Sequence, residues 1–170
     1  VGPATNFGCD SFATIQDAID AVSVGGTVIV YPGTYAEVVT VNKHVTVDGA
    51  GNGTDDSVDT IIDGSAAGSG NTHFSAMTIT GSGASGSSRL TVQDLRIVGT
   101  QFNSINIGGG PTNNASVSFL TIKNVFMDGT AAAGAGTYGR GALISGSGTM
   151  TDLEFDDITA QQFYNGGISM

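Results

Sequence analysis

Basic residues are scarce in this chain of 170 residues, where five Lys and Arg stand against 15 Asp and Glu and the formal net charge is −10. Binding to nucleic acid requires clustered Lys and Arg against the phosphates, so the composition excludes nucleic acid as an expected partner. An anionic membrane surface is disfavoured for the same reason. Charged residues of both signs reach only 12% and glycine is abundant, a composition that we associate with extracellular proteins.

Cysteine and long apolar runs are also lacking. Cys9 is the only cysteine, so no disulfide can form within these residues. No apolar run approaches the roughly 18 residues of a membrane-spanning helix, which predicts that no segment spans a membrane. The sequence begins without a signal peptide, so we expect that a secreted protein would be represented here in its mature form.

Tryptophan is absent and proline occurs three times, whereas glycine occurs 27 times and hydrophobic residues make up 39% of the chain. Disorder is disfavoured because the apolar residues are arranged in strand-like alternation. Glycine at this frequency suits a fold with many tight turns. The length is that of a single domain, and we expect residues 1–170 to form one.

Three stretches of the chain can be aligned with one another, and they are Leu90–Ile97, Leu120–Met127 and Leu153–Ala160. In each, apolar residues alternate with others, an Asp or Asn occupies the fifth position, and an apolar residue follows it. The starts are 30 and 33 residues apart. Strand-like units that repeat with such a period indicate a solenoid. A second repeated strand precedes or follows them, at Ala76–Gly81, Ser104–Gly108, Gly141–Gly146 and Gly167–Met170.

The N-terminal part predicts a helix and then short strands. Apolar residues at helical spacing and a capping Thr predict the helix at Thr14–Val22. Strands are predicted at Thr27–Tyr31, Val38–Val41 and Val45–Val47, with a turn at Pro32–Tyr35 between the first two.

These N-terminal blocks carry a resemblance to a known family. The sequence "TIQDAIDA" from Thr14, the "PGTY" from Pro32 and the "GAG" from Gly49 occur in an order that resembles the start of right-handed parallel β-helix proteins of the pectin lyase-like superfamily. The resemblance implies an all-β, single-stranded right-handed parallel β-helix. It further implies that an amphipathic helix within residues 12–24 caps the N-terminal end, and that about five coils fill residues 27–170. The superfamily holds lyases, hydrolases and adhesins, so the fold leaves the function open.

The aligned Asx position, at Asp94, Asn124 and Asp157, allows two interpretations. One is a row of catalytic carboxylates, to which the neighbouring pair Asp156 and Asp157 would contribute as in glycoside hydrolysis. The other, which we favour, is a stacked ladder of turn residues that tolerate left-handed backbone angles.

An acidic loop and a few basic residues are the remaining candidates. Asp48, Asp55, Asp56 and Asp59 could bind calcium together with loop carbonyls, or they could form a solvated acidic loop. Arg96 and Lys123 could hold the carboxylate of an acidic sugar in a lyase, or they could serve solubility at the surface. Phe126 could stack on a sugar ring, with Tyr138 and Tyr164 as further aromatic candidates.

Three functions are therefore compared. The first is an extracellular β-helix module of a surface, adhesive or structural protein, the second a polysaccharide lyase or glycoside hydrolase, and the third a glycan-binding module. Because the last repeat at Ile168–Met170 resembles the beginning of another coil, we expect further coils beyond it or end-to-end stacking of copies. The expected partners are thus a polysaccharide or copies of the chain itself.

Overall fold

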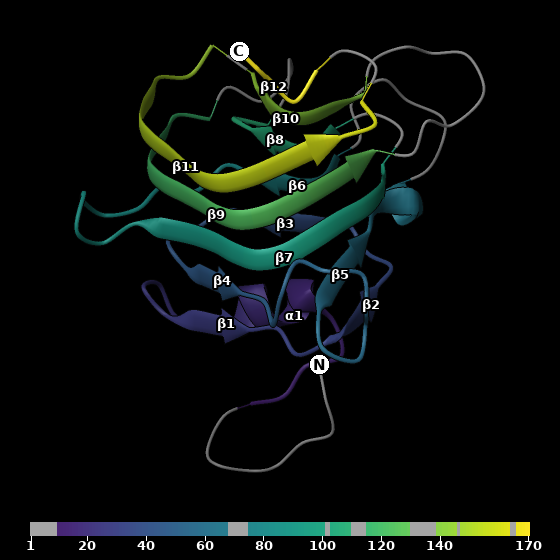
Figure 1. Ribbon diagram of the computed structural model, residues 1–170. Coiled ribbons are helices and arrows are strands. Elements are labelled where there is room, and N and C mark those ends of the chain that lie inside the picture. Colours follow the sequence, from purple (N-terminus) through teal and green to yellow (C-terminus); the bar gives the residue numbers. More distant parts are fainter. Residues whose placement is uncertain are drawn as a thin grey trace.

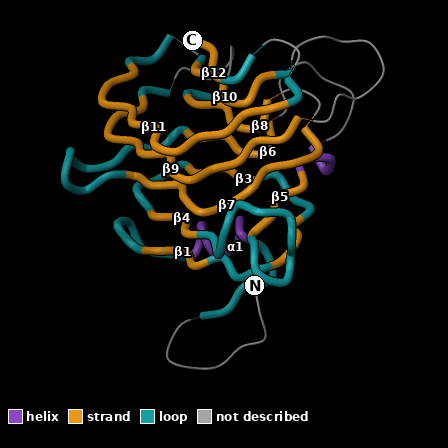
Figure 2. Tube along the Cα trace, viewed as in Figure 1, coloured by secondary structure: helices purple, strands orange, loops and turns teal. Residues whose placement is uncertain are grey.

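A computed structural model describes residues 10–67, 75–100, 103–109, 115–129, 139–145, 147–163 and 166–170. Cys9, Tyr138 and Tyr164 lie outside the described residues. The described chain consists mainly of β-strands in parallel sheets, with one short α-helix, α1 (Ile15–Ala21), and a 3-10 turn at Gly64–Ala67 (Figure 1, Figure 2).

Twelve strands are described, and they follow the repeats of the sequence. They are β1 (Thr27–Ile29), β2 (Gly33–Tyr35), β3 (Val39–Val41), β4 (Thr46–Asp48), β5 (Thr60–Asp63), β6 (Ser75–Ile79), β7 (Leu90–Thr100), β8 (Asn103–Ile107), β9 (Val117–Gly129), β10 (Arg140–Ile144), β11 (Met150–Gln161) and β12 (Ile168–Ser169).

The strands form two sheets, and the chain passes from one to the other and back. We call one passage a coil. The first sheet has the order β1-β4-β7-β5-β2, with β9 on β7 and β11 on β9; the second has the order β12-β10-β8-β6-β3. Every strand pair between these elements is parallel. Successive coils therefore stack upon one another, as Figure 1 shows, and the arrangement is compatible with a parallel β-helix.

The register of the long strands follows the alignment of the three repeats. Leu90 pairs with Leu120, and Leu120 pairs with Leu153. One expectation was wrong: Gly33–Tyr35 was predicted to be a turn, but it is the strand β2 and pairs with β5. Its turn-like sequence is overridden because β5 offers a partner strand from the next coil.

The core is a stack of aliphatic side chains between the two sheets. Val47, Val92 and Ile122 occupy equivalent positions on β4, β7 and β9, and none of them is exposed to solvent. Burial of each such side chain stabilises the fold by about 1.5–3 kcal/mol. The apolar members of the alternating pattern that marked the strands in the sequence thus face this core.

Helix α1 covers the N-terminal end of the stack. Thr14 caps the helix by accepting a 3.0 Å hydrogen bond from the N–H of Asp17, and Ile15 and Ile19 are fully buried. The side-chain amide of Gln16 accepts from the N–H of Thr40 at 2.6 Å and donates to its carbonyl at 3.3 Å. Gln16 thereby occupies backbone groups of β3 that an edge strand would otherwise expose.

The Asx positions of the three repeats lie in the left-handed region of the backbone. Asp94, Asn124 and Asp157 have φ angles of 56°, 49° and 52°. The amide of Asn124 donates to Asp94 Oδ1 at 2.6 Å, and Asn52 donates to Asn124 Oδ1 at 2.7 Å. The aligned residues are therefore bonded from coil to coil at least between Asp94 and Asn124.

The glycine-rich turn after β4 lies directly against this row. A side chain at Gly49 would overlap the carbonyl oxygen of Asp94, which also accepts a 3.0 Å hydrogen bond from the N–H of Gly51. The turn requires glycine at position 49 because two backbones approach each other closely there.

Two substitutions at Asn124 separate the backbone strain from the hydrogen bonds. We expect Asn124→Ala to lower the free energy of unfolding by about 2–4 kcal/mol, because it loses two hydrogen bonds and because Ala lacks the polar side chain that makes positive φ tolerable for Asn. Asn124→Gly loses the same bonds without the strain and should be about 1 kcal/mol less damaging. Urea unfolding measures both, and equal losses would contradict the role of the left-handed turn.

Candidate functional site

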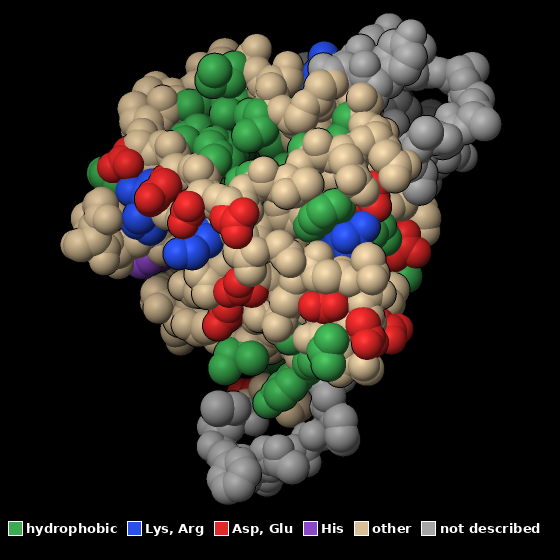
Figure 3. Space-filling view, viewed as in Figure 1, with side chains coloured by type: hydrophobic (Ala, Val, Ile, Leu, Met, Phe, Trp, Pro, Cys, Tyr) green, Lys and Arg blue, Asp and Glu red, His purple; other side chains and the backbone are tan. Residues whose placement is uncertain are grey.

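The outer face of the sheet formed by β7, β9 and β11 carries the polar residues that the sequence singled out. Figure 3 shows acidic and basic side chains interspersed across this side of the molecule. Arg96, Lys123, Asp156 and Asp157 all lie on these three strands. The structure therefore gathers the weak catalytic candidates on one sheet, and their contacts determine what each of them can do.

Arg96 is buried, which corrects the expectation of a surface position. Its side chain is 10% exposed, its Nη2 lies 2.6 Å from Asp128 Oδ2, and its guanidinium stacks over the Phe126 ring at 4.1 Å from the centroid. Ile61 and Phe126 occupy the equivalent positions on the flanking strands and cover it. Asp128 thus occupies one Nη of this guanidinium, and its other oxygen accepts a 3.2 Å hydrogen bond from Gln161.

Phe126 is the aromatic candidate for stacking on a sugar ring. One face of its ring is already covered by Arg96, so that face is closed to a glycan. Thr159 lies at the equivalent position of β11 on the other side. The ring contributes to the contact between coils, and the other aromatic candidates lie outside the described residues.

Lys123 and Asp156 form an ion pair on the surface. Their charged atoms are 3.3 Å apart, and both side chains are more than half exposed. Asp157 follows in the left-handed turn described above. The two neighbouring carboxylates thus have different surroundings, one beside a lysine and the other within a turn. Their part in glycoside hydrolysis stays a prediction.

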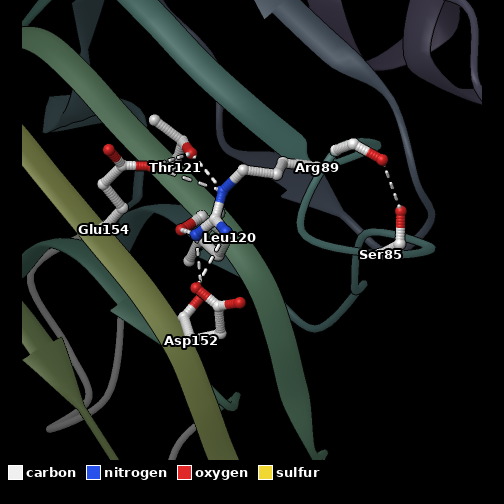
Figure 4. Close-up of polar contacts among 7 residues, drawn as sticks. Ser85, Arg89, Leu120, Thr121, Asp152 and Glu154 are labelled. Carbon is white, nitrogen blue, oxygen red and sulfur yellow. Dashed lines mark hydrogen bonds and ion pairs between the residues drawn. The ribbon is translucent and has the colours of Figure 1, made fainter.

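Arg89 is a residue that the sequence reasoning did not single out. It stands just before β7 and reaches over β9 to β11 (Figure 4). It donates to Thr121 Oγ1 at 2.6 Å, to the carbonyls of Leu120 and Asp152 at 2.8 Å each, and to Asp152 Oδ1 at 2.8 Å. Glu154 Oε2 lies 3.4 Å from its Nε. One guanidinium, only 14% exposed, therefore binds three successive coils together.

A sequence signal for this contact did exist. Arg89, Phe119 and Asp152 each precede the aligned Leu of their repeat, so they occupy the same position in successive coils. Equivalent positions two strands apart are about 10 Å from each other, a distance that a long arginine side chain can bridge to an acid. Phe119 and Asp152 also share a left-handed φ of 53°, which marks a second turn in these two coils.

The acidic loop holds its carboxylates in separate local hydrogen bonds. Asp48 accepts from Gln93 at 2.8 Å, Asp56 from Thr34 at 3.3 Å, and Asp59 from the N–H of Asp55 at 3.1 Å. Among the described residues, no three His, Cys, Asp or Glu side chains form a group that could hold a metal ion. The calcium site at these four aspartates stays a prediction.

Asp55 has a shifted pKa within this loop. The hydroxyl and the N–H of Ser57 both donate to its Oδ1, at 2.6 Å and 3.0 Å, and they lower the pKa of Asp55 below its ordinary value. Because the folded pKa is depressed, the stability that these bonds contribute is present above the ordinary pKa and is lost as the pH falls through the folded value.

Comparisons with protein-family models, curated proteins and solved structures found no match to this chain. The described helix is too short to cross a membrane. The contacts of the chain's own residues therefore carry the functional argument.

Removal of Arg89 should destabilise the fold far more than removal of Lys123. We expect Arg89→Ala to lower the free energy of unfolding by about 1–3 kcal/mol, because several charge-assisted hydrogen bonds are lost and two carbonyls lose a donor. Lys123→Ala is the matched control and should cost no more than about 0.5 kcal/mol, because its ion pair is exposed. Chemical unfolding of both variants measures the difference, and similar midpoints would contradict the role of Arg89 in holding the coils together.

Substitution of Ser57 should raise the pKa of Asp55. In Ser57→Ala the hydroxyl donor is lost while the N–H remains, so we expect the pKa of Asp55 to move partway back toward its ordinary value. NMR titration of the carboxyl carbon measures the shift. Ser65→Ala is a control on the neighbouring loop and should leave Asp55 unchanged. A pKa that does not respond to Ser57→Ala would show that the hydroxyl has no such effect.

Proposed function

We propose that the chain is a right-handed parallel β-helix related to the pectin lyase-like superfamily, and that it serves as an extracellular module of a surface, adhesive or structural protein. The parallel pairing and the capped N-terminal end support the first part of this proposal. The second part rests on how the chain uses its polar side chains.

The observation that carries the proposal is the engagement of the basic side chains in contacts within the fold. Arg89, Arg96 and Lys123 each lie within 4 Å of a carboxylate on a later coil. Lys43 Nζ donates to the carbonyls of Asp20 and Val22 near the end of α1, at 3.0 Å and 2.7 Å. Four of the chain's five basic residues thus connect successive elements of the stack, as expected of a protein whose task is to be a stable scaffold.

Activity on polysaccharides tests this proposal against the enzymatic alternative. We expect no cleavage of uronic-acid polymers or neutral glycans, with or without calcium, because Arg96 is engaged by Asp128 and Phe126. Reducing-end and unsaturated-product assays measure cleavage. Calcium-dependent cleavage that is lost in Arg96→Ala, and retained in Lys123→Ala at equal folded fraction, would overturn the proposal in favour of a lyase.

The two ends of the stack bear on self-assembly. At the N-terminal end, α1 and Gln16 already occupy the edge of β3, which disfavours the head-to-tail stacking expected from the sequence. At the other end, the inward-facing Leu153, Phe155 and Ile158 of β11 are only partly buried. Figure 3 shows hydrophobic side chains exposed at this end of the molecule. Either a further coil or another copy of the chain can cover these side chains, and we include in the proposal that copies associate through β11.

Association of this kind should depend on salt. The formal net charge of the chain is −10, so two copies repel each other at neutral pH and low ionic strength. We expect dimerisation to strengthen as sodium chloride is raised, and to be abolished by Leu153→Lys. Sedimentation velocity measures it, with Val24→Lys at the opposite end as the control. A strictly monomeric chain at high concentration and high salt would refute self-association.

A further inference from the structure

Arg140 differs from the other basic residues because the described structure shows no hydrogen bond or ion pair to its side chain. Its Nε is buried and has no partner. All 15 acidic residues of the sequence lie in the described part of the chain, and none of the ion pairs found there includes Arg140. A partly buried guanidinium without an anion is unfavourable, so this position calls for a counter-charge.

Two further unpaired polar groups lie beside it. Ser75, Asn103 and Arg140 begin β6, β8 and β10, and they occupy the same register position, Asn103 in the middle. Ser75 is 2% and Asn103 is 4% exposed, and in the described structure Ser75 Oγ and Asn103 Oδ1 have no hydrogen-bond partner. We call these three residues the polar column.

The geometry of a parallel sheet places the three groups close together. Equivalent positions on neighbouring strands are about 4.8 Å apart and share one face of the sheet, so the polar column spans only about 10 Å. Buried polar groups are normally paired, and three unpaired atoms at one register position are therefore an exception that needs a partner. Arg140 is the least buried of the three.

We propose that the polar column binds a small carboxylate that carries a hydroxyl or ammonium group next to it, as an α-hydroxy or α-amino acid does. The Nε–H and a neighbouring Nη–H of Arg140 form a fork that matches the two oxygens of a carboxylate. Asn103 Oδ1 is an acceptor and cannot bind the carboxylate, so it accepts a hydrogen bond from the hydroxyl or ammonium group of the ligand. The hydroxyl of Ser75 can donate or accept and completes the site.

The proposed site is separate from the outer face of β7, β9 and β11, and it does not depend on the scaffold function. The repeats of the sequence contain its signal: Ser75, Asn103 and Arg140 each stand just before an aligned strand. A serine, an amide and a base at equivalent positions of successive coils predict a polar column, but its lack of partners is visible only in the structure.

NMR of the arginine Nε–H groups tests the proposal directly, because the sequence contains three arginines. The Arg140 signal is assigned by its loss in Arg140→Gln. We expect it to shift in a saturable manner when L-lactate is added, while the signals of Arg89 and Arg96 stay in place. Acetate should bind about 10-fold more weakly than lactate, because it lacks the hydroxyl and so loses about one hydrogen bond. Sodium chloride at equal ionic strength is the control.

The variant Asn103→Ala separates the two halves of the site. It should reduce lactate affinity to that of acetate and leave acetate affinity unchanged, whereas Arg140→Gln should abolish the binding of both. Urea unfolding identifies any variant that fails to fold, and the titration of the unmodified protein does not depend on the variants. An Arg140 signal that does not shift with either acid would mean that a trapped water or an internal contact is the hydrogen-bond partner of the polar column. That result would overturn the proposal. Equal affinity for lactate and acetate in the unmodified protein would overturn the assignment of Asn103.

Discussion

Parallel stacking in register is the constraint on which the rest of this structure depends. Residues at equivalent positions of successive coils are forced to lie about 4.8 Å apart, with their side chains on the same face. Each position of the repeat is thereby a row of neighbours through the molecule. A row is stable only when its members tolerate one another at that distance, and this requirement explains the composition of each row.

Several kinds of row satisfy the requirement in different ways. Val47, Val92 and Ile122 form an apolar row that excludes water from the core. Asp94 and Asn124 pair a carboxylate with an amide, which avoids two adjacent negative charges at a turn. Arg96 lies between Ile61 and Phe126, where its flat guanidinium can pack against the aromatic ring. The row of Ser75, Asn103 and Arg140 leaves its polar atoms without partners in the described structure, and it is therefore the exception that we interpret as a binding site.

The strong acidity of the chain is compatible with this arrangement because acids and bases meet across coils. Arg89 contacts both Asp152 and Glu154, and Asp128 contacts Arg96. A few bases thus neutralise the acids that would otherwise repel one another on neighbouring strands, and the same contacts hold the coils together. The remaining acids are distributed over loops, α1 and the strands, where solvent, hydrogen bonds and the ion pair of Asp156 with Lys123 accommodate them.

The periodicity of the sequence predicted most strands and their register, because alternation and repeat spacing depend on the local chain and on the core that it faces. Leu90, Leu120 and Leu153 were aligned from sequence and pair in the structure. The failures arose where a contact between coils overrides local preference. Gly33–Tyr35 became a strand because β5 pairs with it, and Arg96 became buried because its neighbours in the row cover it.

For the candidate functional residues, too, the sequence predicted one part and contacts between coils decided the other. The sequence by itself determined which residues share a position in the repeat, and therefore which side chains can meet. Only the tertiary structure decided which of them are satisfied: Arg96 by Asp128, Arg89 by two coils at once, and Arg140 by no described residue. The physical reason is that spacing along the chain sets proximity, whereas burial and hydrogen bonding depend on everything that packs around each row.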